Sequence, residues 1–137
     1  MHQPFPQQPA CYQIRNTITN ERYVGATKNL ADRVYAHFRA LRNGLCPSKR
    51  FQASYDEHGE DAFVVEVIEY TNDPFTRELQ EFVLAFTRGE QLLDATSETR
   101  ARRWLSSPLA TFDVKVVSRL YKSHGWTWAH AARSLTL

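Results

Sequence analysis

Two tyrosines, an arginine and a histidine near the start of the chain are of the types that could form a polar reaction pocket. Tyr12 and Tyr23 lie in short segments with strand propensity. Arg33 and His37 follow, four residues apart. On a helix this spacing places both side chains on one face, at the border of the apolar stripe. A cation and an imidazole beside two phenols would therefore line a pocket at the edge of a core.

Such a pocket matches what hydrolysis of a phosphodiester requires. The reaction needs a base for the attacking water, a cation for the charge that develops on the phosphate oxygens, and usually a divalent metal. The planar fork of an arginine fits phosphate oxygens, tyrosine or histidine exchanges protons with water, and a carboxylate holds Mg²⁺. Taken singly, each residue is more commonly structural, so the interpretation depends on their occurring together.

The tyrosines are predicted to lie on a β-hairpin, and the arginine and histidine on the helix that follows it. The runs 11–16 and 22–25 are extended and flank a turn. Gly25, at the end of the second run, permits a close backbone approach. Apolar residues then repeat at helical spacing over 29–42, which predicts an amphipathic helix. The hairpin and this helix must position the pocket.

Two further helices and one strand complete the predicted unit. Ser48 and Gly59 bound a second helix, and the run 63–70 has the strongest strand pattern, which predicts the central strand of a sheet beside the hairpin. Asp73 is expected to cap a third helix that begins at Pro74. The predicted buried stripe of that helix consists of Phe75, Leu79, Phe82, Val83 and Phe86. We therefore expect an α/β (α+β) fold, a small three-stranded, mainly antiparallel sheet flanked by helices, followed by a short helical C-terminal extension.

These segments, in this order, resemble the GIY-YIG nuclease family, and most of all the nuclease domains of phage intron-encoded homing endonucleases. The resemblance covers residues 10–90. It is carried by Ala10-Cys11-Tyr12-Gln13-Ile14, by Tyr23-Val24-Gly25 and by Arg33-x-x-x-His37-Phe38. The chain departs from the family where Ala10-Cys11 replaces the Gly-Ile of the first motif, which we interpret as a packing variation because the tyrosine is retained.

The resemblance implies a role for each matching residue. Tyr12 is implied as the general base, in a network with Tyr23 and His37, and Arg33 as the residue that contacts phosphate. The implied reaction is the cleavage of DNA strands by water, through one metal ion and without a covalent enzyme intermediate.

The resemblance also implies a single glutamate that binds the metal. Glu81 matches it best, and Glu78, one turn earlier on the same side of the helix, is the alternative. The implied cofactor is Mg²⁺, with Mn²⁺ as a substitute. The family often has an asparagine shortly after this helix, and whether Thr96 or another residue of the run 92–96 replaces it is left open.

Charge divides the chain into three parts. Residues 1–60 carry a net charge of +3, residues 61–99 carry −7, and residues 100–137 carry +6. Basic ends around an acidic middle fit a polyanionic partner. We expect that partner to be double-stranded DNA, contacted by basic side chains of the first two helices and of the C-terminal part, namely Arg39, Lys49, Arg50, Arg100, Arg102 and Arg103.

Three regions are predicted along the chain. Residues 1–9, rich in glutamine and proline, form a disordered lead-in, and 10–95 form the nuclease domain. Residues 96–137 form a basic helical tail, with a helix capped by Thr111, a turn and a further helix over 127–135. This tail resembles the opening of a helix-turn-helix.

Several classes of protein are disfavoured. No apolar run is long enough to span a membrane, no secretory signal is evident, and no glycine-rich loop suggests a nucleotide cofactor. Cys11 and Cys46 are interpreted as reduced thiols of a cytoplasmic protein in a bacterial or phage-infected cell. The predicted function is a divalent-metal-dependent DNA endonuclease. A DNA-binding protein that does not cut, or an interaction protein that docks through its acidic helix, are the alternatives. A monomer and a homodimer on DNA are both left open.

Overall fold

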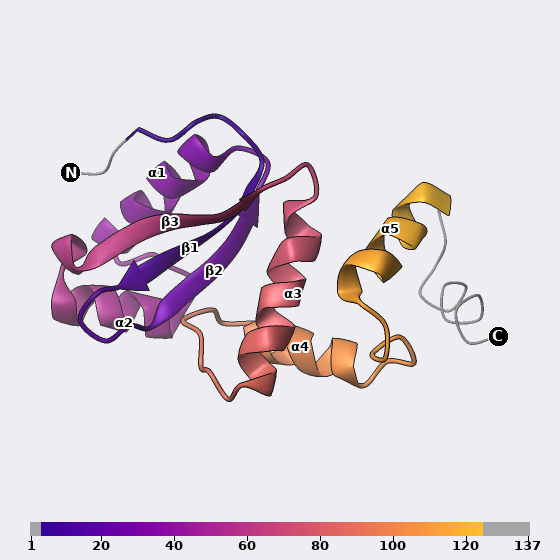
Figure 1. Ribbon diagram of the computed structural model, residues 1–137. Coiled ribbons are helices and arrows are strands. Elements are labelled where there is room, and N and C mark those ends of the chain that lie inside the picture. The colour runs from indigo at the N-terminus through magenta and orange to yellow at the C-terminus, as the bar shows by residue number, and fades with distance from the viewer. Residues whose placement is uncertain (1–3, 125–137) are drawn as a thin grey trace.

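The computed structural model describes residues 4–124 and has three strands and five α-helices in that part of the chain (Figure 1). In chain order the elements are β1 (Ala10–Asn16), β2 (Arg22–Thr27), α1 (Leu30–Arg42), α2 (Lys49–His58), a short 3₁₀ turn (Glu60–Ala62), β3 (Phe63–Tyr70), α3 (Pro74–Thr87), α4 (Ser97–Leu105) and α5 (Val114–His124). None of the described helices is long and apolar enough to cross a lipid bilayer.

The sheet has the strand order β2-β1-β3 and is antiparallel at both pairings. The predicted hairpin and the three-stranded antiparallel sheet are thus confirmed. The predicted place of β3 was wrong, because β1 is the central strand and β3 lies at an edge. Because β1 and β2 pair with each other, a third strand can join only a free edge of the hairpin, so the strong strand pattern of β3 did not indicate a central position.

Side chains of β1 alternate between two apolar cores on opposite faces of the sheet. Tyr12 and Ile14 belong to a core closed by α1 and α2, where Phe38 and Phe51 are buried. Cys11 points to the other face and belongs to a core with Phe82 of α3. The period-two pattern therefore produces three layers, with α1 and α2 on one face and α3 on the other (Figure 1).

Helix α1 begins and ends where its sequence predicts. The side chain of Asn29 accepts a hydrogen bond from the Asp32 N–H at 3.2 Å, which satisfies a free donor of the first turn. Its four buried residues are the predicted stripe of Leu30, Val34, Phe38 and Leu41. Two arginines of α1 are exposed: Arg33, at the border of this stripe, and Arg39, farther round the helix.

Helix α3 differs from its predicted pattern in two respects. The Asp73 side chain does not cap the backbone; its carboxylate accepts a hydrogen bond from the Thr76 hydroxyl at 2.6 Å. Phe75, predicted to be buried, is 48% exposed, whereas Glu78 and Glu81 are buried. The apolar pattern could not predict this, because arginines from other elements pair with both carboxylates and permit their burial.

The segment expected to be a tail packs against α3. Ala101 of α4 joins the core of Cys11 and Phe82, and Trp104 forms a third apolar cluster with Val117 of α5. Helix α5 begins after Asp113, whose carboxylate accepts from the Lys115 N–H, and not after Thr111 as predicted. The predicted helix over 127–135, and with it the helix-turn-helix, lies outside the described residues.

Candidate active site

The pairing of β1 with β2 explains why a glycine follows the second tyrosine. Tyr12 lies directly opposite Gly25 in the register. A Cβ atom on Gly25 would lie 2.5 Å from Cζ of Tyr12, so the phenol ring occupies the space that any larger residue would need. The Tyr12 ring crosses β2 at this point, and its hydroxyl lies 2.5 Å from Nε2 of His37 on α1.

Tyr23 joins the same cluster from β2. Its ring packs edge-on against His37, with centroids 4.8 Å apart, and stacks on Phe51 of α2 at 5.0 Å. The aromatic contacts hold the imidazole between the two phenols, which are themselves fixed by the hairpin. The structure therefore brings together Tyr12, Tyr23 and His37.

Arg33 completes the group, one turn before His37 on α1. Its guanidinium donates hydrogen bonds to the hydroxyls of both Tyr12 and Tyr23, yet the residue is exposed to solvent. Four of the five residues predicted from the sequence thus lie together. One cation is shared by two phenols and open to an incoming anion.

Burial shifts the proton affinities in this cluster. Burial raises the pKa of Tyr23 to about 12 and that of Tyr12 further above its ordinary value, and the Arg33 charge opposes both shifts. Burial, and then Arg33, lower the pKa of His37 to about 3. The imidazole is therefore neutral at physiological pH and can accept the Tyr12 hydroxyl proton in the hydrogen bond at Nε2.

Two buried carboxylates lie along the open edge of β2, where alternate N–H groups face away from the sheet. Asp94 Oδ1 accepts from the Val24 N–H at 2.9 Å, and Glu78 accepts from the Ala26 N–H. Alternate residues of a strand are about 6.8 Å apart, so the two carboxylates are close enough to interact. The Glu78 charge raises the pKa of Asp94, and both carboxylates raise the pKa of Tyr23.

The environment of the Asp94 and Glu78 carboxyl groups disfavours their ionised forms. Burial raises the pKa of Asp94 to about 8, against the hydrogen bond from Val24, and the Glu78 charge adds to the shift. Burial also raises the pKa of Glu78, although Arg100 and Arg33 oppose it. Buried carboxylates beside a cation and two phenols are typical of a site that binds a further cation or transfers protons.

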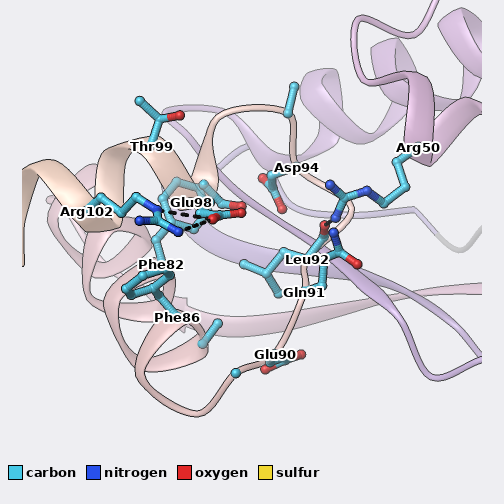
Figure 2. A pocket seen from close by; sticks show the side chains of 14 residues that line it. Arg50, Phe82, Phe86, Glu90, Gln91, Leu92, Asp94, Glu98, Thr99 and Arg102 are labelled. Atoms are coloured by element: carbon cyan, nitrogen blue, oxygen red, sulfur yellow. Dashed lines mark hydrogen bonds and ion pairs between the residues drawn. The ribbon is translucent and has the colours of Figure 1, made fainter.

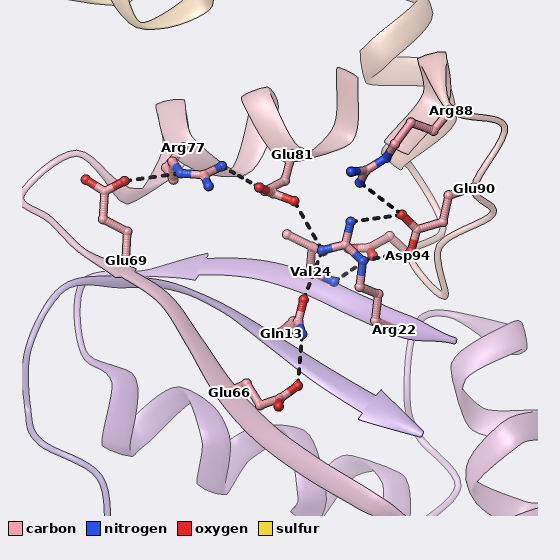
Figure 3. Close-up of polar contacts among 10 residues, drawn as sticks. All are labelled: Gln13, Arg22, Val24, Glu66, Glu69, Arg77, Glu81, Arg88, Glu90 and Asp94. Atoms are coloured by element: carbon pink, nitrogen blue, oxygen red, sulfur yellow. Dashed lines mark hydrogen bonds and ion pairs between the residues drawn. The ribbon is translucent and has the colours of Figure 1, made fainter. Parts of the chain in front are cut away.

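Glu81 has a different environment (Figure 3). Its two carboxylate oxygens lie 3.1 Å from Arg22 Nη1 and 2.6 Å from Arg77 Nη1. Burial raises the pKa of Glu81, but these two arginines outweigh it and bring the pKa below its ordinary value. Arg22 in turn bonds Glu90 and Gln13, so the network ties β2 to α3 and to the loop after it. The geometry favours Glu78 over Glu81 as the carboxylate of the site.

The basic residues predicted to contact DNA fall into two sets. Arg39, Lys49 and Arg103 are exposed. The other three contact other parts of the protein, although Arg50 and Arg102 are exposed as well. Arg50 donates to the Leu92 carbonyl, Arg102 pairs with Glu98 and lies over the Phe86 ring, and Arg100 pairs with Glu78.

Arg50 and Arg102 line a hollow of about 480 Å³ between α2, α3 and α4 (Figure 2). Phe82 and Phe86 give it an apolar wall, and Asp94 lies between the two arginines in this view. Asp94 is therefore the residue through which the hollow meets the open edge of β2. From the sequence, neither this hollow nor Asp94 was assigned to the site. The available signal for Asp94 was a single acidic residue directly after two leucines, Leu92 and Leu93.

Asp94→Asn is expected to make folding less sensitive to pH. In the folded protein the Asp94 pKa is about 8, against 3.8 ordinarily, so the folded state holds a proton that the unfolded state has lost at neutral pH. The free energy of unfolding should then fall as pH rises from about 4 to about 8, by at most about 1.4 kcal/mol per pH unit. Asparagine keeps the acceptor for Val24 but does not ionise.

Urea unfolding of both proteins, in chelator, at about pH 5 and about pH 8 measures this effect. The variant should gain stability relative to the wild type at the higher pH, and the two should converge at the lower. Parallel pH profiles would show that Asp94 is ionised in the folded protein.

The donors at the edge of β2 fit a hard divalent cation. Among residues 4–124, no three His, Cys, Asp or Glu side chains form a cluster that could enclose a metal. Mg²⁺ does not need such a cage, since it is commonly held by one or two carboxylates and keeps several waters. Glu78, whose charge is balanced by arginines in the structure, can supply that carboxylate, with Asp94 beside it.

Comparison with known proteins gives independent information on the fold and the family. A family model described as the GIY-YIG catalytic domain matches residues 8–81. Intron-associated endonuclease 1 of Enterobacteria phage T4 is 38% identical over 64 residues, which are 45% of this chain and 26% of that protein. The chain thus spans about a quarter of that relative.

Two solved structures also match. The catalytic domain of homing endonuclease I-TevI is 33% identical, over 52% of this chain and 80% of that one, with a TM-score of 0.47. A point mutant of the catalytic domain of intron endonuclease I-TevI is 27% identical, over 59% of this chain and 82% of that one, with a TM-score of 0.51. The latter match agrees with the sheet and flanking helices described above.

Proposed function

Because the chain belongs to the GIY-YIG family, we propose that it is a DNA endonuclease that hydrolyses phosphodiester bonds, with Mg²⁺ held by Glu78. The observation that supports this most strongly is the arrangement of Arg33 between the hydroxyls of Tyr12 and Tyr23, on the same helix as His37 and within electrostatic range of the buried Glu78 carboxylate. Similarity to phage intron endonucleases supports DNA as the substrate.

Arg33 provides the positive charge for the reacting phosphate. Its exposed guanidinium can approach two phosphate oxygens while it remains anchored to the two hydroxyls. The charge that develops on the phosphate in the transition state then meets a cation already in place, so little reorganisation is needed. When bound, Mg²⁺ would stabilise the leaving 3′ oxygen as a Lewis acid.

The two tyrosines have different proposed roles toward the attacking water. Tyr12 is fully buried, so its hydroxyl is not placed to meet bulk water, whereas Tyr23 is partly exposed. We therefore assign contact with the attacking water to Tyr23, with Arg33 beside it to favour the phenolate. Tyr12 and His37 hold the Tyr23 ring and Arg33 in position. This revises the sequence-based assignment of Tyr12 as the base that contacts water.

The exposed side chains of α1 and α2 extend the proposed DNA surface. Arg39 lies on the same helix as Arg33, and Lys49 begins α2; both are exposed. Cations on neighbouring helices around a phosphate-binding arginine would bind a DNA backbone without regard to sequence. We also propose that the DNA substrate is double-stranded.

Incubation of supercoiled plasmid with the purified chain tests the proposed function. We expect conversion to nicked or linear DNA with Mg²⁺ or Mn²⁺, and none in chelator. A protein that binds several DNA substrates in a salt-dependent manner but leaves all of them intact would be a DNA-binding module on a nuclease fold, and the proposal would be rejected.

A further inference from the structure

Arg100 of α4 reaches the carboxylate that we assign to the metal. Its Nη1 donates to Glu78 Oε1 at 2.8 Å, and its guanidinium carbon lies 4.9 Å from the centre of the Phe82 ring. The Glu78 side chain is 12% exposed, whereas that of Arg100 is 38% exposed. The arginine thus contacts the buried carboxylate while part of its own side chain is exposed to solvent.

The Glu78 carboxylate therefore has two compensating cations from different helices. Arg33 acts from α1 and Arg100 acts from α4, and both stabilise the ionised form of a buried acid. A divalent cation bound to the same oxygens would supply this compensation itself. It would also repel a guanidinium in hydrogen-bonding contact with those oxygens.

We infer that Arg100 occupies the metal position of Glu78 in the free protein, so that a divalent cation must displace its guanidinium in order to bind. This inference rests on the proposed function, because it takes Glu78 as the metal ligand. Ala101 and Trp104 anchor α4 in two apolar clusters to which α3 also contributes, so the displacement involves the Arg100 side chain and not the helix. The partial exposure of Arg100 provides a path into solvent.

Displacement of Arg100 by the metal predicts the direction in which metal affinity changes when Arg100 is replaced. Removal of the Arg100 charge should tighten metal binding, because the cation no longer competes with a charge-assisted hydrogen bond. A bond of that kind corresponds to roughly a tenfold change in affinity. A residue that merely oriented Glu78 for the metal would have the opposite effect, since its loss would weaken binding.

Titration calorimetry of the metal-free full chain with Mn²⁺, in the absence of DNA, tests the inference. Arg100→Gln should bind Mn²⁺ about tenfold more tightly than the wild type. Arg100→Lys keeps the charge and should remain near the wild type. Arg103→Gln is the matched control, because it removes the same charge from an exposed position on the same helix. Equal affinities for Arg100→Gln and Arg103→Gln, or weaker binding by Arg100→Gln, would overturn the inference.

A measurement on the wild type avoids dependence on the folding of the variants. The NMR signals of the Arg100 Nη1 protons should show faster exchange with water when Ca²⁺ is added, and unchanged signals at saturating Ca²⁺ would contradict displacement. Glu78→Gln separates this inference from the proposed function. If that variant binds Mn²⁺ as the wild type does, Glu78 is not the ligand and both fail. If it does not bind but Arg100→Gln shows no gain, only the inference about Arg100 fails.

Discussion

Replacement of Arg33 by alanine is expected to reduce the rate of DNA cleavage by about a thousandfold while the fold is retained. Arg33 is exposed and belongs to neither apolar core, so its loss removes no core packing. It is, however, the cation that bonds both tyrosine hydroxyls, and the reacting phosphate would bind at its open side. The variant loses the charge that stabilises the transition state, and the phenols lose the cation that favours their ionised form.

The effect is measured by the single-turnover rate of plasmid nicking at saturating protein. Arg42→Ala is the matched control, because Arg42 lies on the same helix but pairs with Glu60 and not with Tyr12 or Tyr23. Arg33→Lys should recover part of the rate, since lysine keeps the charge but not the planar fork. An Arg33→Ala protein that nicks at the rate of the Arg42→Ala control would remove Arg33 from the reaction.

Gly25→Ala is expected to damage both stability and activity. The new methyl group would overlap the Tyr12 ring, so the ring must move away from β2 or the two strands must separate. Overpacking of this kind costs about 1–3 kcal/mol of the free energy of unfolding. Because the same ring carries the hydroxyl that bonds His37, cleavage should fall by more than the loss of folded protein explains.

Gly44→Ala provides the comparison. Gly44 has a φ of 71° and no atom within 4 Å of the position its Cβ would take, so alanine there is strained through the backbone, by about 1 kcal/mol, without contact to Tyr12. Urea unfolding and plasmid nicking should be measured on both variants. A Gly25→Ala protein with wild-type stability and wild-type nicking would show that the contact between Tyr12 and Gly25 is not needed.

The sequence predicted the part of the site that depends on local structure. The hairpin and α1 follow from period-two and helical patterns, and these place Tyr12, Tyr23, Arg33 and His37 within reach of one another. Gly25 was also predicted to permit a close approach, and the structure shows that a phenol ring takes up the space. Spacing along a strand and a helix was sufficient because no distant segment is needed to bring these four residues together.

The remaining features depend on contacts between segments far apart in the chain. Glu78 and Glu81 are one turn apart on α3, and their partners distinguish them: Arg22 and Arg77 pair with Glu81, whereas Arg100 and the β2 edge contact Glu78. Asp94 becomes part of the site through a backbone N–H of β2. Arg100 looked like a surface residue of a basic tail, yet α4 folds back on α3 and brings it to Glu78. Patterns within single elements carry no information on such pairings.

The proposed metal site depends on which of the two glutamates of α3 binds the cation, and plasmid nicking by Glu78→Gln and Glu81→Gln tests this most directly. Both substitutions remove one buried charge from the same helix and keep its shape, and circular dichroism establishes that both variants are folded. We expect Mg²⁺-dependent nicking to be lost in Glu78→Gln and retained in Glu81→Gln, because Glu81 is occupied by Arg22 and Arg77. Nicking by Glu78→Gln at the wild-type rate, with loss of nicking in Glu81→Gln, would contradict the site described above.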